Sequence, residues 1–181
     1  PLDPPTVAVA AGSGPRHLVL SPDGTNVYVL TEFSGEAIRL ARDPASGVLT
    51  RAESVPGHDT TRGLGHSIFG ADPLEHHYIW GADLHLTPDG RRLLCSERTE
   101  STLTTIEVAP DGRLLDPMAV TGTERQPRGF ALSPDGRLVL AVGERSDHLA
   151  LSRLEDDGTL TPVSRTPTGT GANWVRAIPL A

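Results

Sequence analysis

The fold is decided by the stretch QPRGFALSPDG, residues 126–136, because a related stretch occurs twice more along the chain. Residues 14–24 read GPRHLVLSPDG, and residues 81–90 read GADLHLTPDG. In each copy an apolar run ends in a Pro-Asp-Gly triplet, and a second apolar run follows the glycine. Proline fixes φ, aspartate bonds the turn backbone and glycine accepts positive φ, so each triplet predicts a hairpin between two strands.

Each copy continues into a third, alternating run, and then through a glycine-containing turn or loop into a fourth, more polar run. Four short strands joined by tight turns form the blade of a β-propeller. The repeat therefore predicts an all-β chain in which residues 1–181 form a single partial β-propeller domain. We expect three complete blades, at roughly 15–55, 82–122 and 127–167.

The spacing between the repeats indicates one insertion. The turn prolines Pro88 and Pro134 lie 46 residues apart, an ordinary blade length, whereas Pro22 and Pro88 lie 66 apart. We assign the extra residues to an inserted loop at 56–81 that crosses one face of the ring. The loop is rich in histidine, but its histidines lack the paired spacing of a zinc site. We expect neither a metal nor another cofactor.

The two ends of the chain suggest strands of further blades. The segment 5–10 looks like the last strand of a preceding blade, and 173–180 looks like a closing strand that begins a following one. Three blades with two lone strands leave open sheet edges, which soluble proteins avoid. We therefore expect a partner that completes the ring, either a missing N-terminal half of the propeller or a second copy packed head to tail.

Composition excludes several classes of function. The net charge of −7 argues against a nucleic-acid partner, and no apolar stretch approaches the roughly 20 residues that span a membrane. The single cysteine, Cys95, lies in an apolar run and is expected to be a buried, inert thiol. With no disulfide possible within the chain, a cytoplasmic location is expected. All 16 basic residues are arginine, so a lysine Schiff base is excluded.

Polar residues interrupt the repeat where the first strand of each blade should be apolar or small. A charged residue also stands eight positions after each turn glycine, at Glu32, Arg98 and Glu144. Equivalent positions in successive blades converge on the ring axis. The predicted site therefore consists of Arg16, His17, Glu32, Asp83, His85, Arg98 and Arg128. Glu144 taken alone is interpreted as a solvated strand end.

Known catalytic motifs are missing from the sequence. Residues 65–70 do not have the spacing of a G-x-S-x-G nucleophile elbow, and neither H-E-x-x-H nor a P-loop occurs. The predicted site contributes three arginines, two histidines and two carboxylates. This set suits an anionic substrate and a water molecule activated by a general base.

Three motifs, taken in this order, are similar to those of a known family. Gly-Pro-Arg-His at 14–17, Ala-Asp-Leu-His at 82–85 and Gln-Pro-Arg-Gly-Phe at 126–130 resemble the seven-bladed lactonases of the bacterial cycloisomerase-type 6-phosphogluconolactonase family. The whole chain resembles the C-terminal half of that family's length. It departs from the family at Thr31, where relatives usually have asparagine before the glutamate, and it lacks the blades that supply the other side of the channel.

The resemblance implies hydrolysis of 6-phospho-D-glucono-1,5-lactone to 6-phosphogluconate, a step of the pentose phosphate pathway, without a metal. Arg98 and Arg128 would bind the phosphate, and Arg16 or His17 would stabilise the oxyanion. Glu32 or Asp83 would deprotonate the attacking water, assisted by His85. Two alternatives remain open: a muconate-type lactonising cycloisomerase, whose arginines bind carboxylates, and a non-catalytic propeller fragment that acts as a binding module.

Overall fold

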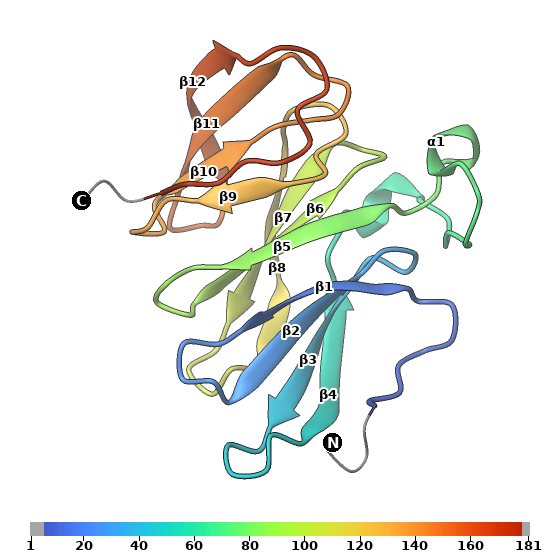
Figure 1. Ribbon diagram of the computed structural model, residues 1–181, viewed down its shortest axis with the longest axis vertical. Helices are drawn as coiled ribbons and strands as arrows, with labels where there is room; N and C mark the ends of the chain where they lie inside the picture. Colours follow the sequence, from blue (N-terminus) through green and yellow to red (C-terminus); the bar gives the residue numbers. More distant parts are fainter. Residues whose placement is uncertain (1–5, 179–181) are drawn as a thin grey trace.

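The structure, a computed structural model, describes residues 6–178. Three four-stranded antiparallel sheets follow one another along the chain, each with its strands in sequence order (Figure 1). Blade 1 consists of β1 (Pro15–Leu20), β2 (Asn26–Thr31), β3 (Glu36–Arg42) and β4 (Leu49–Pro56). Blade 2 consists of β5 (Gly81–Leu86), β6 (Arg92–Glu97), β7 (Thr102–Val108) and β8 (Leu114–Gly122). Blade 3 consists of β9 (Phe130–Leu132), β10 (Leu138–Ala141), β11 (His148–Leu154) and β12 (Leu160–Pro167). The all-β propeller fold is confirmed.

The Pro-Asp-Gly triplets form the hairpins between the first and second strand of each blade. In blade 1 the Asp23 carboxylate accepts a hydrogen bond from the Thr25 backbone nitrogen at 3.0 Å, and Gly24 has a φ of 69°. Asp89 and Asp135 accept equivalent bonds in the other two blades. The same local chemistry therefore starts each blade in the same register.

The core lies between the blades, because alternate residues of a strand face opposite neighbours. On β6, Leu93 and Cys95 pack toward blade 1 with Tyr28, whereas Leu94 packs toward blade 3 with Phe130. Cys95 is fully buried, and burial raises the pKa of its thiol, as expected for an inert cysteine. Each blade therefore depends on its neighbours for a covered surface.

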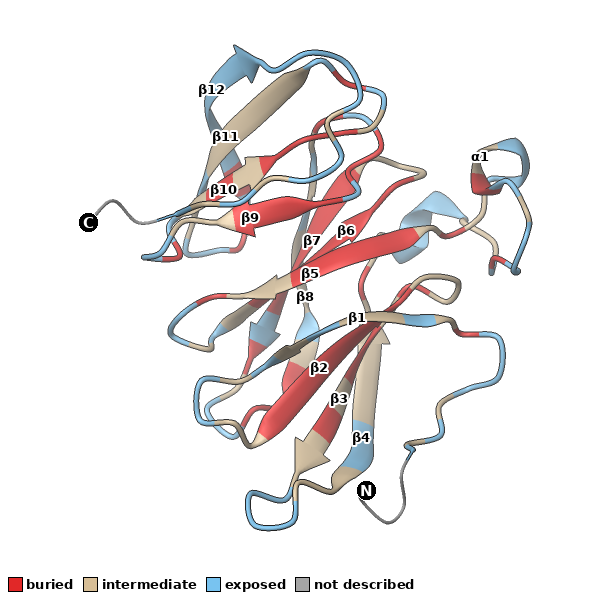
Figure 2. Cartoon of the chain, viewed as in Figure 1, coloured by how far each residue is buried: buried red, intermediate tan, exposed pale blue. Residues whose placement is uncertain are grey.

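Burial follows the position of each blade in the row. Strands β6 and β7 of the middle blade are almost entirely buried, whereas β12 at the end of the row is exposed along most of its length (Figure 2). The outer face of blade 1 is covered in part by Val7 and Val9. In the described part of the chain, the outer faces of blade 1 and blade 3 are therefore not covered by a further blade.

The expected end strands stay predictions, because each was expected to pair with a blade outside this chain. Neither 6–10 nor 173–178 is a strand, while positions 5, 179 and 180 lie outside the described residues. The C-terminal segment runs beside β9, where Asn173 and Trp174 lie against Gly129 (Figure 1). A strand requires a hydrogen-bonded neighbour, and the described residues supply none to either segment.

The inserted segment between β4 and β5 contains two short helical turns, a 3₁₀ turn (Thr60–Arg62) and α1 (Pro73–His76). Asp72 caps α1 by accepting a hydrogen bond from the Leu74 nitrogen, and a bridge joins Gly65 to Tyr78. Neither described helix has the length and hydropathy to cross a membrane. Within residues 6–178, no three His, Cys, Asp or Glu side chains are grouped to hold a metal ion.

Gly143 marks a close approach of two backbone segments beside β10. A Cβ at this position would overlap the carbonyl oxygen of Arg125, which cannot move aside because it belongs to the backbone. We expect Gly143→Ala to lower the free energy of unfolding by about 1–3 kcal/mol, measured by urea denaturation. Gly122→Ala is the control, because a Cβ there meets no atom within 4 Å. An unchanged midpoint for Gly143→Ala would contradict this packing.

Candidate active site

A chain of ion pairs joins the three blades at the end where the first strand of each blade begins and its second strand ends. Arg16 Nε lies 3.6 Å from Glu32 Oε2, and Arg98 Nη2 lies 2.6 Å from Glu32 Oε1. Arg98 Nη1 lies 3.9 Å from Glu144 Oε2, and Arg128 Nη1 lies 3.1 Å from Glu144 Oε1. These five residues, here called the arginine–glutamate chain, come from positions up to 128 apart in the sequence, Arg16 to Glu144. Tertiary packing alone brings them together.

Arg98 occupies the centre of the arginine–glutamate chain. Its side chain is only 3% exposed, and Trp80 covers it, with the guanidinium carbon 3.7 Å from the ring centroid. The Trp80 indole nitrogen also donates to Glu32 Oε1 at 3.0 Å. Burial lowers the pKa of Arg98 to about 10, against the opposing attraction of Glu32, so this arginine remains protonated at neutral pH. Trp80 and Arg98 together fix one oxygen of Glu32.

A second polar group surrounds Asp83 on β5. Oδ1 lies 2.9 Å from His17 Nδ1 and Oδ2 lies 3.1 Å from His85 Nε2. The backbone nitrogens of Leu84 and Phe130 donate to the same carboxylate, at 3.0 and 3.3 Å. Asp83 therefore links residues of all three blades, and we call these side chains and their partners the Asp83 cluster.

Burial and hydrogen bonding act in opposite directions on Asp83. Its burial raises the pKa, but the bonds from His85, His17 and the Phe130 nitrogen outweigh burial, and the net pKa lies below the usual value. The carboxylate is therefore ionised at neutral pH, and its side chain is only 4% exposed. Glu32, at 28% exposed, is the more accessible of the two carboxylates.

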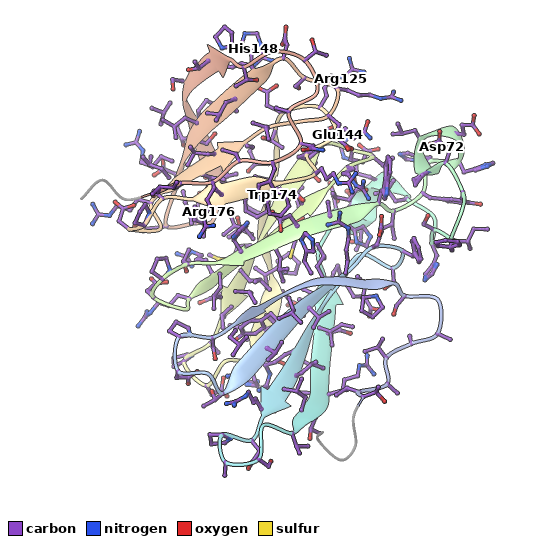
Figure 3. The ribbon with its side chains drawn as sticks, viewed as in Figure 1. Asp72, Arg125, Glu144, His148, Trp174 and Arg176 are labelled. Atoms are coloured by element: carbon purple, nitrogen blue, oxygen red, sulfur yellow. The ribbon has the colours of Figure 1, made fainter. Side chains whose placement is uncertain are left out.

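Arg16 connects the two groups. Its Nη1 donates to the Ala82 carbonyl oxygen and lies 3.4 and 3.3 Å from the two ring nitrogens of His17. Burial lowers the pKa of Arg16, and the charge of Glu32 offsets part of this effect. On its other side, His17 meets the ring of Trp174 edge-on at a centroid distance of 5.9 Å, and Trp174 belongs to the C-terminal segment beside β5 (Figure 3).

The structure brings together all seven residues singled out from the sequence, within these two connected groups. Their chemical roles remain predictions. The interpretation of Glu144 as a solvated strand end is wrong, because its carboxylate binds Arg128 and accepts a hydrogen bond from Gln126 at 3.0 Å. A charge that looks isolated in the sequence finds these partners only when blade 3 folds.

Sequence reasoning gave no role to three residues at the site. Trp80 and Gln126 both lie eight positions before a turn proline, and this shared position in the repeat could have identified them as site residues. Glu97 is buried and holds the backbone beside Trp80, accepting hydrogen bonds from the nitrogens of Trp80 and Thr99. Glu97 could not be recognised from the repeat, because the residues at the same position in blades 1 and 3 are Thr31 and Gly143, which carry no charge.

Fold and site define a β-propeller segment with an arginine–carboxylate centre at the ends of its inner strands. The family described as lactonase, 7-bladed β-propeller, matches residues 2–177. This chain belongs to that lactonase family.

The curated relatives of this chain are named 6-phosphogluconolactonase. A 6-phosphogluconolactonase of Sodalis glossinidius is 33% identical over 183 residues, covering 98% of this chain and 50% of the relative. One from Photorhabdus laumondii is 33% identical, covering 96% of this chain and 48% of the relative. The chain thus spans about half the length of the curated relatives it matches, in keeping with three blades of a seven-bladed ring.

Solved structures agree with this relationship. A protein from Lactobacillus plantarum is 27% identical with a TM-score of 0.78, over 93% of this chain and 46% of the other. A periplasmic gluconolactonase from Pseudomonas aeruginosa is 29% identical with a TM-score of 0.76, over 95% of this chain and 45% of the other. In both cases the likeness covers nearly the whole of this chain and less than half of the other.

Proposed function

We propose that this chain supplies one side of the active site of a lactone hydrolase, and that the substrate is 6-phospho-D-glucono-1,5-lactone. The observation that carries this proposal is the arginine–glutamate chain, in which three guanidinium groups meet two carboxylates. The three guanidinium groups suit a substrate with a phosphate and a carbonyl that becomes an oxyanion. The names of the curated relatives support the same substrate.

Glu32 is the general base in this proposal. Its carboxylate accepts a proton from water as the water oxygen attacks the lactone carbonyl carbon. Arg16 and His17 donate hydrogen bonds to the oxyanion that forms, a contribution worth about 10²–10³ in rate for one donor. Collapse of the intermediate restores the carbonyl and breaks the ring C–O bond. The ring oxygen leaves with the proton from Glu32 and becomes a hydroxyl group.

The remaining residues position these groups. Asp83 is enclosed by four donors, so we assign it to orienting His17 and His85 rather than to accepting a proton from water. Arg98 is too deeply buried to meet a phosphate without displacing Trp80, so we assign it to orienting Glu32. Arg128, at 44% exposed, remains the arginine for the phosphate.

The phosphate assignment predicts a selective effect of Arg128→Leu. A charge-assisted hydrogen bond contributes about 1.5–3 kcal/mol, so KM for the phosphorylated lactone should rise about tenfold or more. KM for glucono-1,5-lactone, which has no phosphate, should change less than twofold. Acid release in a pH-stat measures both rates after subtraction of spontaneous hydrolysis. Arg113→Leu, on the exposed surface, is the control. Equal losses for both lactones would contradict the assignment.

The function itself is tested by assaying the purified chain alongside its native mass. We propose that activity requires a closed ring, formed with an N-terminal propeller half or with a second copy of this chain. The substrates are the phosphorylated lactone, glucono-1,5-lactone and a muconolactone. Preference for the muconolactone would indicate a cycloisomerase-type site. If no assembled form of the chain accelerates the hydrolysis of any of these lactones, the remaining alternative is a non-catalytic binding module. We also propose a cytoplasmic location, based on the single buried cysteine.

A further inference from the structure

Gln126 has a backbone conformation that residues with large side chains rarely adopt. Its φ is 60°, in the left-handed region, yet its side chain is largely buried. Two hydrogen bonds hold the backbone there: its nitrogen donates to Ser101 Oγ at 3.0 Å, and its carbonyl oxygen accepts from the Glu144 nitrogen at 3.0 Å. A strained residue held in place by its surroundings often marks a functional position.

The Gln126 side chain determines which donor binds each carboxylate oxygen of Glu144. The amide Nε2 donates to Glu144 Oε2 at 3.0 Å, while Arg128 Nη1 takes Oε1 at 3.1 Å. Arg98 Nη1 stops 3.9 Å from the same Oε2, beyond hydrogen-bond distance. The amide therefore occupies the oxygen that Arg98 would otherwise bind.

Arg98 has donors left over for this competition. Only its Nη2 is hydrogen-bonded to a carboxylate, that of Glu32, while Nη1 lies 3.9 Å from Glu144 Oε2 and the buried Nε has no hydrogen-bond partner within the described residues. A guanidinium with an unsatisfied N–H gains from any carboxylate that comes within reach. Glu144 is the nearest such carboxylate besides Glu32, so release of Oε2 would draw Glu144 toward Arg98 and away from Arg128.

We propose that Gln126 is a positioning residue that keeps Glu144 paired with Arg128 and leaves Arg98 paired with Glu32. It thereby holds Arg128 in the orientation that receives the anionic group of the ligand. The strained backbone is needed because only this conformation directs the amide at Oε2. The inference rests on the proposed function for the identity of the anion, but the division of the ion pairs does not depend on catalysis.

The two possible roles of Gln126 predict opposite effects on stability. A side chain retained only for structure would lower stability when removed. A strained positioning residue should leave stability unchanged or increased in Gln126→Gly, because glycine adopts positive φ without strain. Affinity for the anion should nevertheless fall. Asparagine also tolerates positive φ, and its shorter amide cannot reach Oε2, so Gln126→Asn should show the same loss of affinity.

The test uses Trp80 as an internal reporter. The chain has two tryptophans, so Trp174→Phe leaves Trp80 as the only indole, in contact with Arg98 and Glu32. In this background, wild-type Gln126 and the Gly and Asn variants are titrated with 6-phosphogluconate and with inorganic phosphate. We expect about tenfold weaker binding of 6-phosphogluconate in both variants and an altered Trp80 emission before ligand is added. In the active assembly KM should rise with little change in kcat.

His77→Gly is the matched control for strain, because His77 also has positive φ, at 53°, but lies in the inserted segment. It should match Gln126→Gly in stability and leave binding unchanged. Unchanged affinity and emission in the Gln126 variants would overturn the inference. A lower melting temperature in both Gln126→Gly and Gln126→Asn would also overturn it. Failure of the wild-type chain to bind either probe would also overturn it. Normal probe binding without lactone hydrolysis would instead contradict only the proposed function.

Discussion

Glu32→Gln is expected to lower kcat/KM for lactone hydrolysis by about 100-fold or more, since a general base contributes roughly 10²–10⁴. The amide cannot accept the proton of the attacking water. It also adds a third donor beside those of Arg98 and Trp80, which lie 2.6 and 3.0 Å from Glu32 Oε1. The rate is measured as acid release in the assembly that hydrolyses the lactone.

Two further variants separate loss of the base from loss of structure. Glu107→Gln removes the same charge from an exposed position of β7 and should leave the rate unchanged. Glu32→Asp keeps the carboxylate but shortens it, and should retain more activity than Glu32→Gln. Circular dichroism before each assay verifies the fold. A less than threefold effect of Glu32→Gln, with the fold intact, would assign the proton transfer to another group.

Asp83→Ala is expected to give the largest loss of stability, about 3–5 kcal/mol in the free energy of unfolding, because it removes one partner of a buried, charged network. Four donors from three blades converge on this carboxylate: His17, His85 and the backbone nitrogens of Leu84 and Phe130. Urea denaturation should show a lower midpoint at an unchanged slope. A midpoint within experimental error of wild type would show that the cluster contributes no stability.

The same carboxylate predicts a pH dependence. The pKa of Asp83 in the folded chain lies below its value in the unfolded chain, which is about 3.9. Its stabilising contribution is therefore fully present above the unfolded pKa and is lost as the pH falls through the folded pKa. The stability difference between wild type and Asp83→Asn should be largest near neutral pH and should shrink below about pH 4. Asp116→Asn, at an exposed position, should show no such dependence.

The blades could be predicted from the sequence because their signals are local. The Pro-Asp-Gly turns need only the residues within them, as the Asp23 to Thr25 hydrogen bond shows. Apolar alternation on β6 then places Leu93 and Leu94 on opposite faces without further information. The end strands are a different case, because their formation does not depend on local signals. A strand at 6–10 or 173–178 depends on a hydrogen-bonded neighbour, which no local pattern reveals.

By itself, the sequence determined the repeat, the number of blades and the register that points Arg16, Glu32 and Arg128 toward a common axis. Only the tertiary structure decided which charges pair and which remain accessible. Asp83 and Glu32 look equivalent in the sequence, yet one is enclosed by four donors and the other is partly open. Part of this difference comes from partners on neighbouring blades, 47 to 66 residues away: His17 and the Phe130 nitrogen at Asp83, and Arg98 at Glu32. Burial and pairing of a charge depend on those distant contacts, because both the dielectric and the available donors are set by packing.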